Sequence, residues 1–596
     1  MNFQEAEQRK KRENRLARLR RFSFWISFIA VGVIIYDLGF RHPSIKNYHL
    51  TSFYLFALLV GTVTIIARAV IRRTKLLLKV KIFDGIILFL FTILFLIKTN
   101  VVAGDAFFFS FFNNMGWLYI TVITYFIREI STFTFNFNKD FFNPAQLITV
   151  SFLSLIIIGA FLLMLPKATY EGISPIDALF TSTSAVCVTG LIVVDTGTYF
   201  TPFGQNIILL LIQLGGLGIM TFASYFSYFF RGRSTYENQI MLKDVTNAEK
   251  IGEVFNVLKK IVVLTFAIEI VGAIFIYFSI NKSLMPVFFD RFIFSIFHSI
   301  SAFCNAGFST LSNGLYETEF RFNYPLQLII IALFVLGGIG FPLLFNLYKY
   351  LVYFIKKQVM KIKNPKESIY IPWVLNINSR IVLITTSILL VIGTVLFYFF
   401  EKENTLAEHS GFGKFVVSFF GAATPRTAGF NSVDMTALNF STIMIIFILM
   451  WIGASPGSTG GGIKTTTFAI ATLNFFSIAR GKDRVELYKR EISDLSIRRA
   501  FSIISLSLLV IGSAIFLIAS FDGEMTLLSI AFECFSAYST VGLSLGITPL
   551  LSSPSKLVII ATMFIGRVSM LTILIALLRR VKHLNYRYPK EEILIN

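Results

Sequence analysis

Four pentapeptides, each with glycine in the fourth position, recur along the chain: Cys187-Val188-Thr189-Gly190-Leu191, Cys304-Asn305-Ala306-Gly307-Phe308, Arg426-Thr427-Ala428-Gly429-Phe430 and Ser539-Thr540-Val541-Gly542-Leu543. Their glycines are 117, 122 and 113 residues apart. This spacing predicts a fourfold internal repeat in which one loop of each unit meets the others at a common axis. Backbone arranged in this way can replace the water around a cation.

The composition is typical of a multispanning membrane protein, with 55% hydrophobic residues and a mean hydropathy of +0.72. The chain also carries 54 lysines and arginines against 33 acidic residues. A nucleic-acid partner is not expected, because the basic residues form short clusters between apolar stretches, as cytoplasmic loops do. We therefore expect both termini in the cytoplasm. The clusters lie at 9–21, 72–81, 356–366, 482–499 and 579–590.

The rule that a spanning helix needs about 20 apolar residues predicts twelve spans. The fourth is the weakest, because Asn113 and Asn114 interrupt it, but without it all later loops would change sides. The first is expected to be a retained helix, since no small-residue cleavage site precedes Arg41. The spans are 22–40, 52–71, 82–98, 106–128, 147–165, 206–230, 257–280, 325–354, 379–401, 440–478, 499–520 and 556–578.

Shorter apolar segments lie directly before the pentapeptides, at 176–186, 291–303, 413–425 and 526–538. They are too short to span, and we expect them to be re-entrant pore helices whose hydroxyls bond non-helical backbone. The fold class is then an all-α polytopic membrane protein with four pseudo-symmetric units of helix, pore helix, filter loop and helix. The expected organisation is a basic cytoplasmic N-terminus (1–21), four extra transmembrane helices (22–130), pore units 1 to 4 (145–231, 255–355, 377–480 and 498–580) and a cytoplasmic tail (581–596).

The pentapeptides are expected to be filter loops, because glycine permits the positive φ that turns successive carbonyls toward one axis. We number them filter loops 1 to 4 in chain order. Arg426 is more simply a brace for loop 3 than an ion contact, since its charge would repel a cation. The candidate ion-binding residues are Cys187, Val188, Thr189, Gly190, Cys304, Asn305, Ala306, Gly307, Arg426, Thr427, Ala428, Gly429, Ser539, Thr540, Val541 and Gly542.

Enzymatic chemistry has no support in the sequence. The five histidines are scattered, and no HExxH motif, nucleophile elbow or Walker A lysine is present. The three cysteines show no CxxC spacing, so neither a disulfide framework nor a zinc site is predicted. We expect no enzyme activity and no covalently bound cofactor.

Five stretches of the chain together carry a family resemblance: 181–191, 213–218, 298–308, 424–430 and 455–464. They resemble the Trk/Ktr/HKT superfamily of cation transporters, and within it the bacterial Trk-type potassium-uptake pore subunit. The resemblance covers about residues 140 to 580. It implies a homodimer in the bacterial inner membrane, potassium as the permeant ion, and a cytosolic nucleotide-binding (RCK/TrkA-like) regulatory subunit, through which alone nucleotide would act.

A glycine-rich loop interrupts the tenth span at 453–464. Its five glycines and Pro456 would strongly destabilise a continuous helix. The resemblance implies an obstructing loop that moves on opening; a passive kink is the alternative. We expect only pore unit 3 to break its second helix in this way. Within the loop, Lys464 is either a gate partner or an anchor reaching toward the interface. The candidate gate residues are Gly457, Ser458, Thr459, Gly460, Gly461, Gly462, Lys464 and Arg567.

Arg567 lies near the centre of the last span, where an arginine costs at least about 2.5 kcal/mol. We expect it beneath the filter, repelling cations and hydrogen-bonding the glycine-rich loop. The alternative is a structural partner for Glu533 or for a carbonyl. The resemblance is incomplete just after this arginine, because Ser569-Met570 stands where a glycine-proline pair is common.

Two alternatives remain open for the function. Glu269 in the seventh span and Glu533 in the fourth pore helix are expected to be paired or hydrogen-bonded structural groups; the alternative is proton coupling, which would make the chain an ion-coupled K⁺ or Na⁺ symporter. A scaffold or receptor without transport is the other. The resemblance favours potassium over sodium because position 190 is glycine, whereas a serine there goes with sodium transport in the plant branch of the same superfamily. The basic segment 9–21 could contact anionic membrane lipid.

Overall fold

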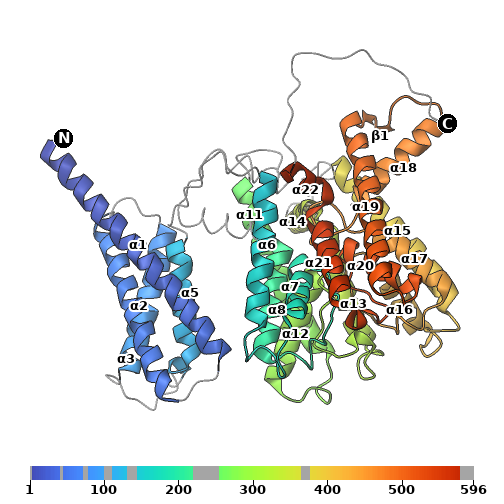
Figure 1. Ribbon diagram of the computed structural model, residues 1–596. Coiled ribbons are helices and arrows are strands. Elements are labelled where there is room, and N and C mark those ends of the chain that lie inside the picture. The colour runs from blue at the N-terminus through green and yellow to red at the C-terminus, as the bar shows by residue number, and fades with distance from the viewer. Residues whose placement is uncertain are drawn as a thin grey trace.

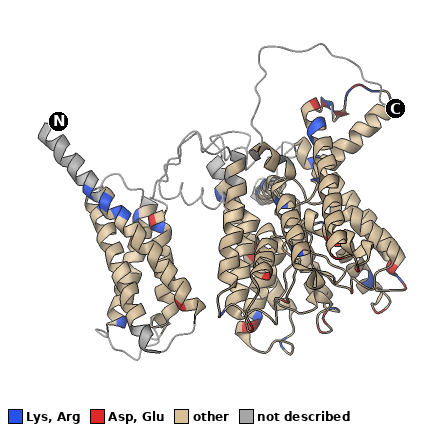
Figure 2. Cartoon of the chain, in the orientation of Figure 1, with Lys and Arg blue, Asp and Glu red and all other residues tan. Residues whose placement is uncertain are grey.

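The computed structural model of the 596-residue chain describes residues 3–40, 44–71, 78–99, 111–130, 144–218, 254–363 and 376–577. These ranges are helical apart from turns, loops and one hairpin of two short antiparallel strands, β1 (Glu486–Leu487) and β2 (Arg490–Glu491). Six of the described helices are long and apolar enough to cross a membrane, and a bent pair adds a seventh. The predicted all-α polytopic membrane fold is confirmed. Many of the segments coloured as Lys, Arg, Asp or Glu lie toward the ends of the helices (Figure 2).

The four extra N-terminal helices form a bundle of their own, drawn in blue in Figure 1. They are α1 (Phe3–Gly39), α2 (Ser44–Ile71), α3 (Leu78–Lys98) and α5 (Met115–Ile130). Ala30, Tyr54, Leu94 and Leu118 are fully buried at its centre. The first three helices confirm predicted spans. The fourth is 16 residues long, and part of its predicted range, 106–110, lies outside the described residues.

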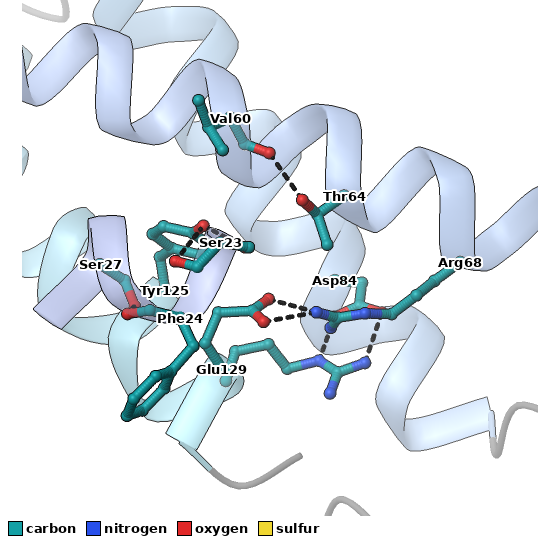
Figure 3. A network of polar contacts seen from close by, with 10 residues as sticks. Ser23, Phe24, Ser27, Val60, Thr64, Arg68, Asp84, Tyr125 and Glu129 are labelled. Carbon is teal, nitrogen blue, oxygen red and sulfur yellow. Dashed lines mark hydrogen bonds and ion pairs between the residues drawn. The ribbon is translucent and has the colours of Figure 1, made fainter. Parts of the chain in front are cut away.

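Charges inside this bundle are paired. Arg68 Nη2 lies 2.6 Å from Glu129 Oε2, and Arg128 Nε lies 2.6 Å from Asp84 Oδ1 (Figure 3). Arg128 and Glu129 are adjacent on α5 but point to different helices: Arg128 bonds to α3, and Glu129 bonds to α2. Because isolated charges are costly in hydrocarbon, these pairs fix α2, α3 and α5 together.

The remaining helices form four pore units. The expected pore helices are present in all four, each within three residues of its predicted ends. Unit 1 contains α6 (Pro144–Leu163), α7 (Pro175–Cys187) and α8 (Pro202–Leu217); unit 2 contains α11 (Val254–Ser279), α12 (Phe288–Phe303), α13 (Tyr324–Gly338) and α14 (Phe341–Lys363); unit 3 contains α15 (Ile377–Glu401), α16 (Gly411–Ala423), α17 (Phe440–Trp451) and α18 (Thr465–Ala479); unit 4 contains α19 (Asp494–Phe521), α20 (Leu527–Ser539), α21 (Ser553–Val568) and α22 (Met570–Leu577).

Local sequence explains where several of these helices begin. Ser174 precedes Pro175 and accepts a hydrogen bond from Asp177 N, so it caps α7 in the way that serine and proline favour. Thr201 with Pro202 does the same for α8, and Thr526 caps α20. The pore helices therefore start at fixed residues, which places their C-terminal ends and the filter loops that follow.

The units close into a ring. The second helix of each unit packs against the pore helix of the next: α8 against α12, α13 against α16, α17 against α20, and α21 back against α7. The last contact joins unit 4 to unit 1 and completes the circuit. These four contacts connect the four units in a closed cycle.

The second helix is broken in units 2 and 4 as well as in unit 3, so the prediction that only unit 3 breaks is wrong; in unit 1 the described part of the second helix ends at Leu217. Gly218 (φ +76°) ends α8, α13 and α14 meet at a 110° bend that contains Gly340 (φ +89°), and Ser569 (φ +73°) separates α21 from α22. A residue with positive φ cannot continue a right-handed helix. The predicted continuous spans 325–354 and 556–578 are therefore each two helices, and helix α8 of span 206–230 ends at Leu217, with 219–230 outside the described residues.

Gly218, Gly340 and Ser569 each lie three residues after a glycine that packs against its own pore unit. A Cβ on Gly215, Gly337 or Gly566 would lie under 3.0 Å from the backbone oxygen of the residue just before a filter loop. These three glycines allow close helix packing. The residues three positions later, Gly218, Gly340 and Ser569, have positive φ and end the helix.

Candidate cation pore

The backbone of all four filter loops alternates in handedness. The second residue and the fourth-position glycine both have positive φ, with the residue between them on the negative side. A uniformly extended strand points successive carbonyls in opposite directions, whereas this alternation turns them to the same side. Positive φ is uncommon for residues other than glycine and is found at strained functional sites. The values are +58° and +91° at Val188 and Gly190, +60° and +68° at Asn305 and Gly307, +70° and +79° at Thr427 and Gly429, and +50° and +91° at Thr540 and Gly542.

The four filter glycines meet one another in cyclic order. A Cβ at any of them would lie under 3.0 Å from the backbone of the next filter loop, a separation that real side chains do not adopt. No other amino acid fits these positions without moving the neighbouring loop. The approaches are Gly190 to Ala306 O, Gly307 to the Gly429 Cα, Gly429 to Val541 O, and Gly542 to Thr189 O.

Hydroxyls of the pore helices hold the filter backbone, as predicted. Ser184 Oγ accepts from Gly190 N at 3.0 Å, and Ser536 Oγ accepts from Gly542 N at 3.1 Å. Ser301 Oγ donates to the carbonyl oxygen of Phe308 at 2.7 Å. In unit 3 this role falls to Thr424, which the sequence analysis did not assign and which donates to Phe430 O at 2.6 Å. The helix C-termini that carry these groups present partial negative charge to the ring.

The glycine-rich loop (453–464) lies against the first half of the filter loops. Thr459 Oγ1 donates to Asn305 Oδ1 at 2.9 Å, and Gly461 N donates to Thr540 Oγ1 at 2.9 Å. A Cβ at Gly460 would lie under 3.0 Å from the hydroxyl of Thr427. The loop therefore touches three of the four filter loops, on the side away from the glycine ring.

The loop is also tied to the bend of unit 2. Ser455 N donates to Gly338 O at 2.9 Å, and Phe341 N donates to Gly457 O at 2.9 Å. The break in α13–α14 thus supplies free backbone groups that the glycine-rich loop uses. This explains physically why unit 2 bends where it does, because a continuous helix would have no free groups to offer.

Arg567 bridges the glycine-rich loop to unit 1. Its Nη1 donates to Thr459 O, and its Nη2 donates to Gly215 O at 2.7 Å. The predicted hydrogen bond to the loop is therefore present. Glu533 is not its partner, because that carboxylate accepts from Ser544 and Thr548 instead.

Lys464 and Arg426 occupy different places. Lys464 Nζ turns back to Gly460 O at 2.6 Å, so its charge lies on the loop rather than extending toward an interface. Arg426 is buried, and its Nη2 lies 3.4 Å from the Thr386 hydroxyl on α15. That contact fits the predicted brace for filter loop 3.

Two features of the site were missed by sequence reasoning. The polar second residues Asn305, Thr427 and Thr540 face the glycine-rich loop; the repetition of Thr or Asn at that position was the available signal. Glu401 at the end of α15 is fully buried and accepts from Asn404, Thr405, Asn439 and Thr442. An acidic residue closing an apolar helix before an Asn- and Thr-rich stretch was its signal.

Among the described residues no group of three His, Cys, Asp or Glu side chains could hold a metal ion. The filter loops offer backbone carbonyl oxygens on either side of their positive-φ residues, a kind of ligand that suits a weakly held cation in transit. Short helices and loops with carbonyls turned to one side form a ring among apolar helices. This arrangement places the chain in the class of membrane cation-transport proteins.

Comparison with known proteins agrees with this class. The chain belongs to the TrkH family, whose sequence model, described as "Cation transport protein", matches residues 112–585. It is 37% identical to Ktr system potassium uptake protein B of Bacillus subtilis (strain 168), over 76% of this chain and 96% of that protein. It is 35% identical to potassium/sodium uptake protein NtpJ of Enterococcus hirae, over 76% of this chain and 97% of that protein.

The crystal structure of the potassium transporter TrkH from Vibrio parahaemolyticus is similar in fold. Its TM-score is 0.58 at 17% identity, covering 84% of this chain and 98% of that one. The membership in a family of transporters agrees with the prediction that the chain is not an enzyme.

Proposed function

We propose that this protein takes up potassium through a gated pore whose selectivity filter is formed by filter loops 1 to 4. The observation that carries the proposal is the closed ring of Gly190, Gly307, Gly429 and Gly542, each at positive φ and each against the next loop. Carbonyls so arranged replace the hydration shell of an ion, and K⁺ dehydrates into such a ring without any bound metal or cofactor. The names of the relatives, which include potassium uptake proteins, support K⁺ as the permeant ion.

The glycine-rich loop and Arg567 are proposed as the gate. The loop touches three filter loops, and the guanidinium of Arg567 adds a positive charge beneath them. In this arrangement the pore is closed, because the loop stands in the path and the arginine repels cations. Opening requires the hydrogen bonds of Thr459 and Gly461 to break, which small residues with several accessible conformations permit.

The setting proposed for this pore is a homodimer in the bacterial inner membrane with both termini in the cytoplasm. A cytosolic nucleotide-binding (RCK/TrkA-like) subunit would move the gate, and nucleotide would act only through it. The family membership supports this assembly. Since the sequence offers no ATP site, transport runs down the electrochemical gradient, worth about 2.3 kcal/mol per charge per 100 mV.

The test is rescue of potassium-uptake-deficient bacteria at low external K⁺, with and without a regulatory subunit encoded nearby. We expect growth with the wild-type chain, and stronger growth when the subunit is present. A Gly307→Asp variant, which inserts a side chain into the ring, is the matched control and should not rescue. Failure of the wild-type chain to rescue growth, although it is present in the membrane, would contradict potassium uptake and favour a scaffold or receptor.

Ion-coupled symport is the second candidate, and Glu269 is the observation that favours it. This buried carboxylate has only neutral hydrogen-bond partners among the described residues. The name of the E. hirae relative adds sodium as a possible coupled or transported ion. A reversal potential that shifts with pH or with the Na⁺ gradient would establish coupling, and one that follows K⁺ alone would exclude it.

A further inference from the structure

Glu269 lies at the junction of pore units 1 and 2. It is in the middle of α11 and is 4% exposed. Its Oε2 accepts a hydrogen bond from Gln213 Nε2 of α8 at 3.1 Å, and its Oε1 lies 3.8 Å from Cys304 Sγ, the first side chain of filter loop 2. Ser299 of the pore helix donates to the backbone oxygen of Glu269 at 2.6 Å. We call Glu269, Gln213 and Cys304 the Glu269 cluster.

The carboxylate of Glu269 lacks a basic partner among the described residues. Among the other buried acids, Asp84 and Glu129 pair with arginines, Glu401 accepts from five donors, and Asp37 and Glu533 each accept from two hydroxyls. An ionised carboxylate without a counter-charge is costly in a membrane, and such residues are functional by default.

The elements packed around Glu269 offer few other charges. Helix α8 contains no ionisable side chain, and α13 contains only Tyr324 at its far end. On α12, Asp290 and Arg291 lie in the first turn, where Arg291 donates to the Tyr277 hydroxyl of α11, and His298 bonds Phe294 O and Ser309. The ionisable group that faces the carboxylate is the Cys304 thiol. Arg567 lies beyond it, held to Gly215 O of α8.

The missing positive charge could come from a cation held by filter loop 2, which lies next to Glu269. Cys304 begins this loop, and a Cβ on Gly216 of α8 would lie under 3.0 Å from its sulfur, so the thiol is wedged between α8 and Glu269. The next residue, Asn305, contacts both Thr427 of filter loop 3 and Thr459 of the glycine-rich loop. A cation in the filter at loop 2 would therefore be separated from the Glu269 carboxylate by a single layer of side chains, to which Cys304 belongs.

We propose that Glu269, in its ionised form, strengthens cation binding in the filter at loop 2, with the permeant ion as its counter-charge. This inference rests on the proposed role of the filter loops in potassium uptake. Glu269 is a positioning and electrostatic residue rather than a direct ligand, because Cys304 separates it from the loop backbone. Protonation removes its charge, so the affinity for K⁺ should fall as the pH falls.

The experiment measures the KM and maximal rate of K⁺ uptake, in cells and in proteoliposomes, for wild type, Glu269→Gln and Glu269→Asp. A charge interaction through a partly solvated protein interior predicts that Glu269→Gln raises KM roughly tenfold with a smaller change in maximal rate. Glu269→Asp keeps the charge and should stay nearer to wild type. Glu533→Gln is the matched control, since that buried acid bonds Ser544 and Thr548 beyond filter loop 4.

The pH profile separates an electrostatic role from a structural one. The wild-type KM should rise on acidification, whereas the KM of Glu269→Gln should be high and flat. A wild-type KM and pH profile in Glu269→Gln, or an equal change in Glu533→Gln, would overturn the inference. If Glu269→Gln does not fold, a pH-independent KM in the wild type and in Glu269→Asp would overturn it instead.

The outcome is distinguishable from failure of the proposed function. If the wild type does not transport K⁺, the filter assignment fails first. If the wild type transports K⁺ but its reversal potential shifts with pH, Glu269 carries protons and the electrostatic role is wrong.

Discussion

Replacing Arg567 by alanine removes two hydrogen bonds from a charged donor, one to Thr459 O of the glycine-rich loop and one to Gly215 O of α8. Only the bond to Thr459 has to break for the loop to leave the filter. A hydrogen bond to a charged group contributes about 1.5–3 kcal/mol. Because about 1.4 kcal/mol is a factor of ten, Arg567→Ala should raise the ratio of open to closed pores by about 10- to 150-fold.

The assay is K⁺ flux or single-channel current from purified protein in liposomes without a regulatory subunit. Arg567→Ala should show a high basal flux, and Arg567→Lys an intermediate one, since lysine keeps the charge but cannot hold both carbonyls at once. The closed-pore account also predicts that added regulatory subunit stimulates Arg567→Ala less than wild type. Wild-type basal flux and normal stimulation in Arg567→Ala would refute the assignment of this residue to the gate.

Three further outcomes are expected. Gly190→Ser should weaken discrimination against Na⁺ in competitive uptake, because its Cβ would displace Ala306 of filter loop 2; unchanged relative K⁺ and Na⁺ uptake would remove the reason for choosing potassium. Ser569→Gly should stabilise the protein by about 1 kcal/mol by relieving a positive φ, measured as a higher apparent Tm in detergent, and a lower Tm would contradict the strain. Glu401→Ala should destabilise by about 2–4 kcal/mol, since five donors from four residues lose a buried acceptor; Glu401→Gln should lose less, and equal Tm values for wild type and Glu401→Ala would show that these bonds do not matter.

The repeat and its pore helices were predictable from sequence because their signals are local. The length of an apolar segment and a glycine at a fixed distance after it locate each filter loop. The pairing of Arg567 with the glycine-rich loop was predictable because a midplane arginine needs a polar partner and that loop was the interruption expected within the spans. Its second partner, Gly215, was not, since it lies 352 residues away and offers only a backbone oxygen.

The breaks in the second helices could not be predicted for a different reason. Glycine both packs helices closely and stops them, and the sequence does not show which role applies. Gly337 packs, whereas Gly340, three residues later, has positive φ at the bend. At Ser569 the residue type itself is misleading, because serine ordinarily avoids that backbone conformation. Only the structure shows that units 2 and 4 break their second helices as unit 3 does.

The reversal potential of the purified chain in proteoliposomes tests the central claim most directly. With a K⁺ gradient, equal Na⁺ on both sides and equal pH, a carbonyl filter for potassium predicts a potential that moves by about 59 mV for each tenfold change in K⁺. Changing the pH or the Na⁺ gradient at constant K⁺ should leave it in place. A potential that follows Na⁺, or that shifts with pH, would contradict a potassium-selective pore formed by the four glycine loops.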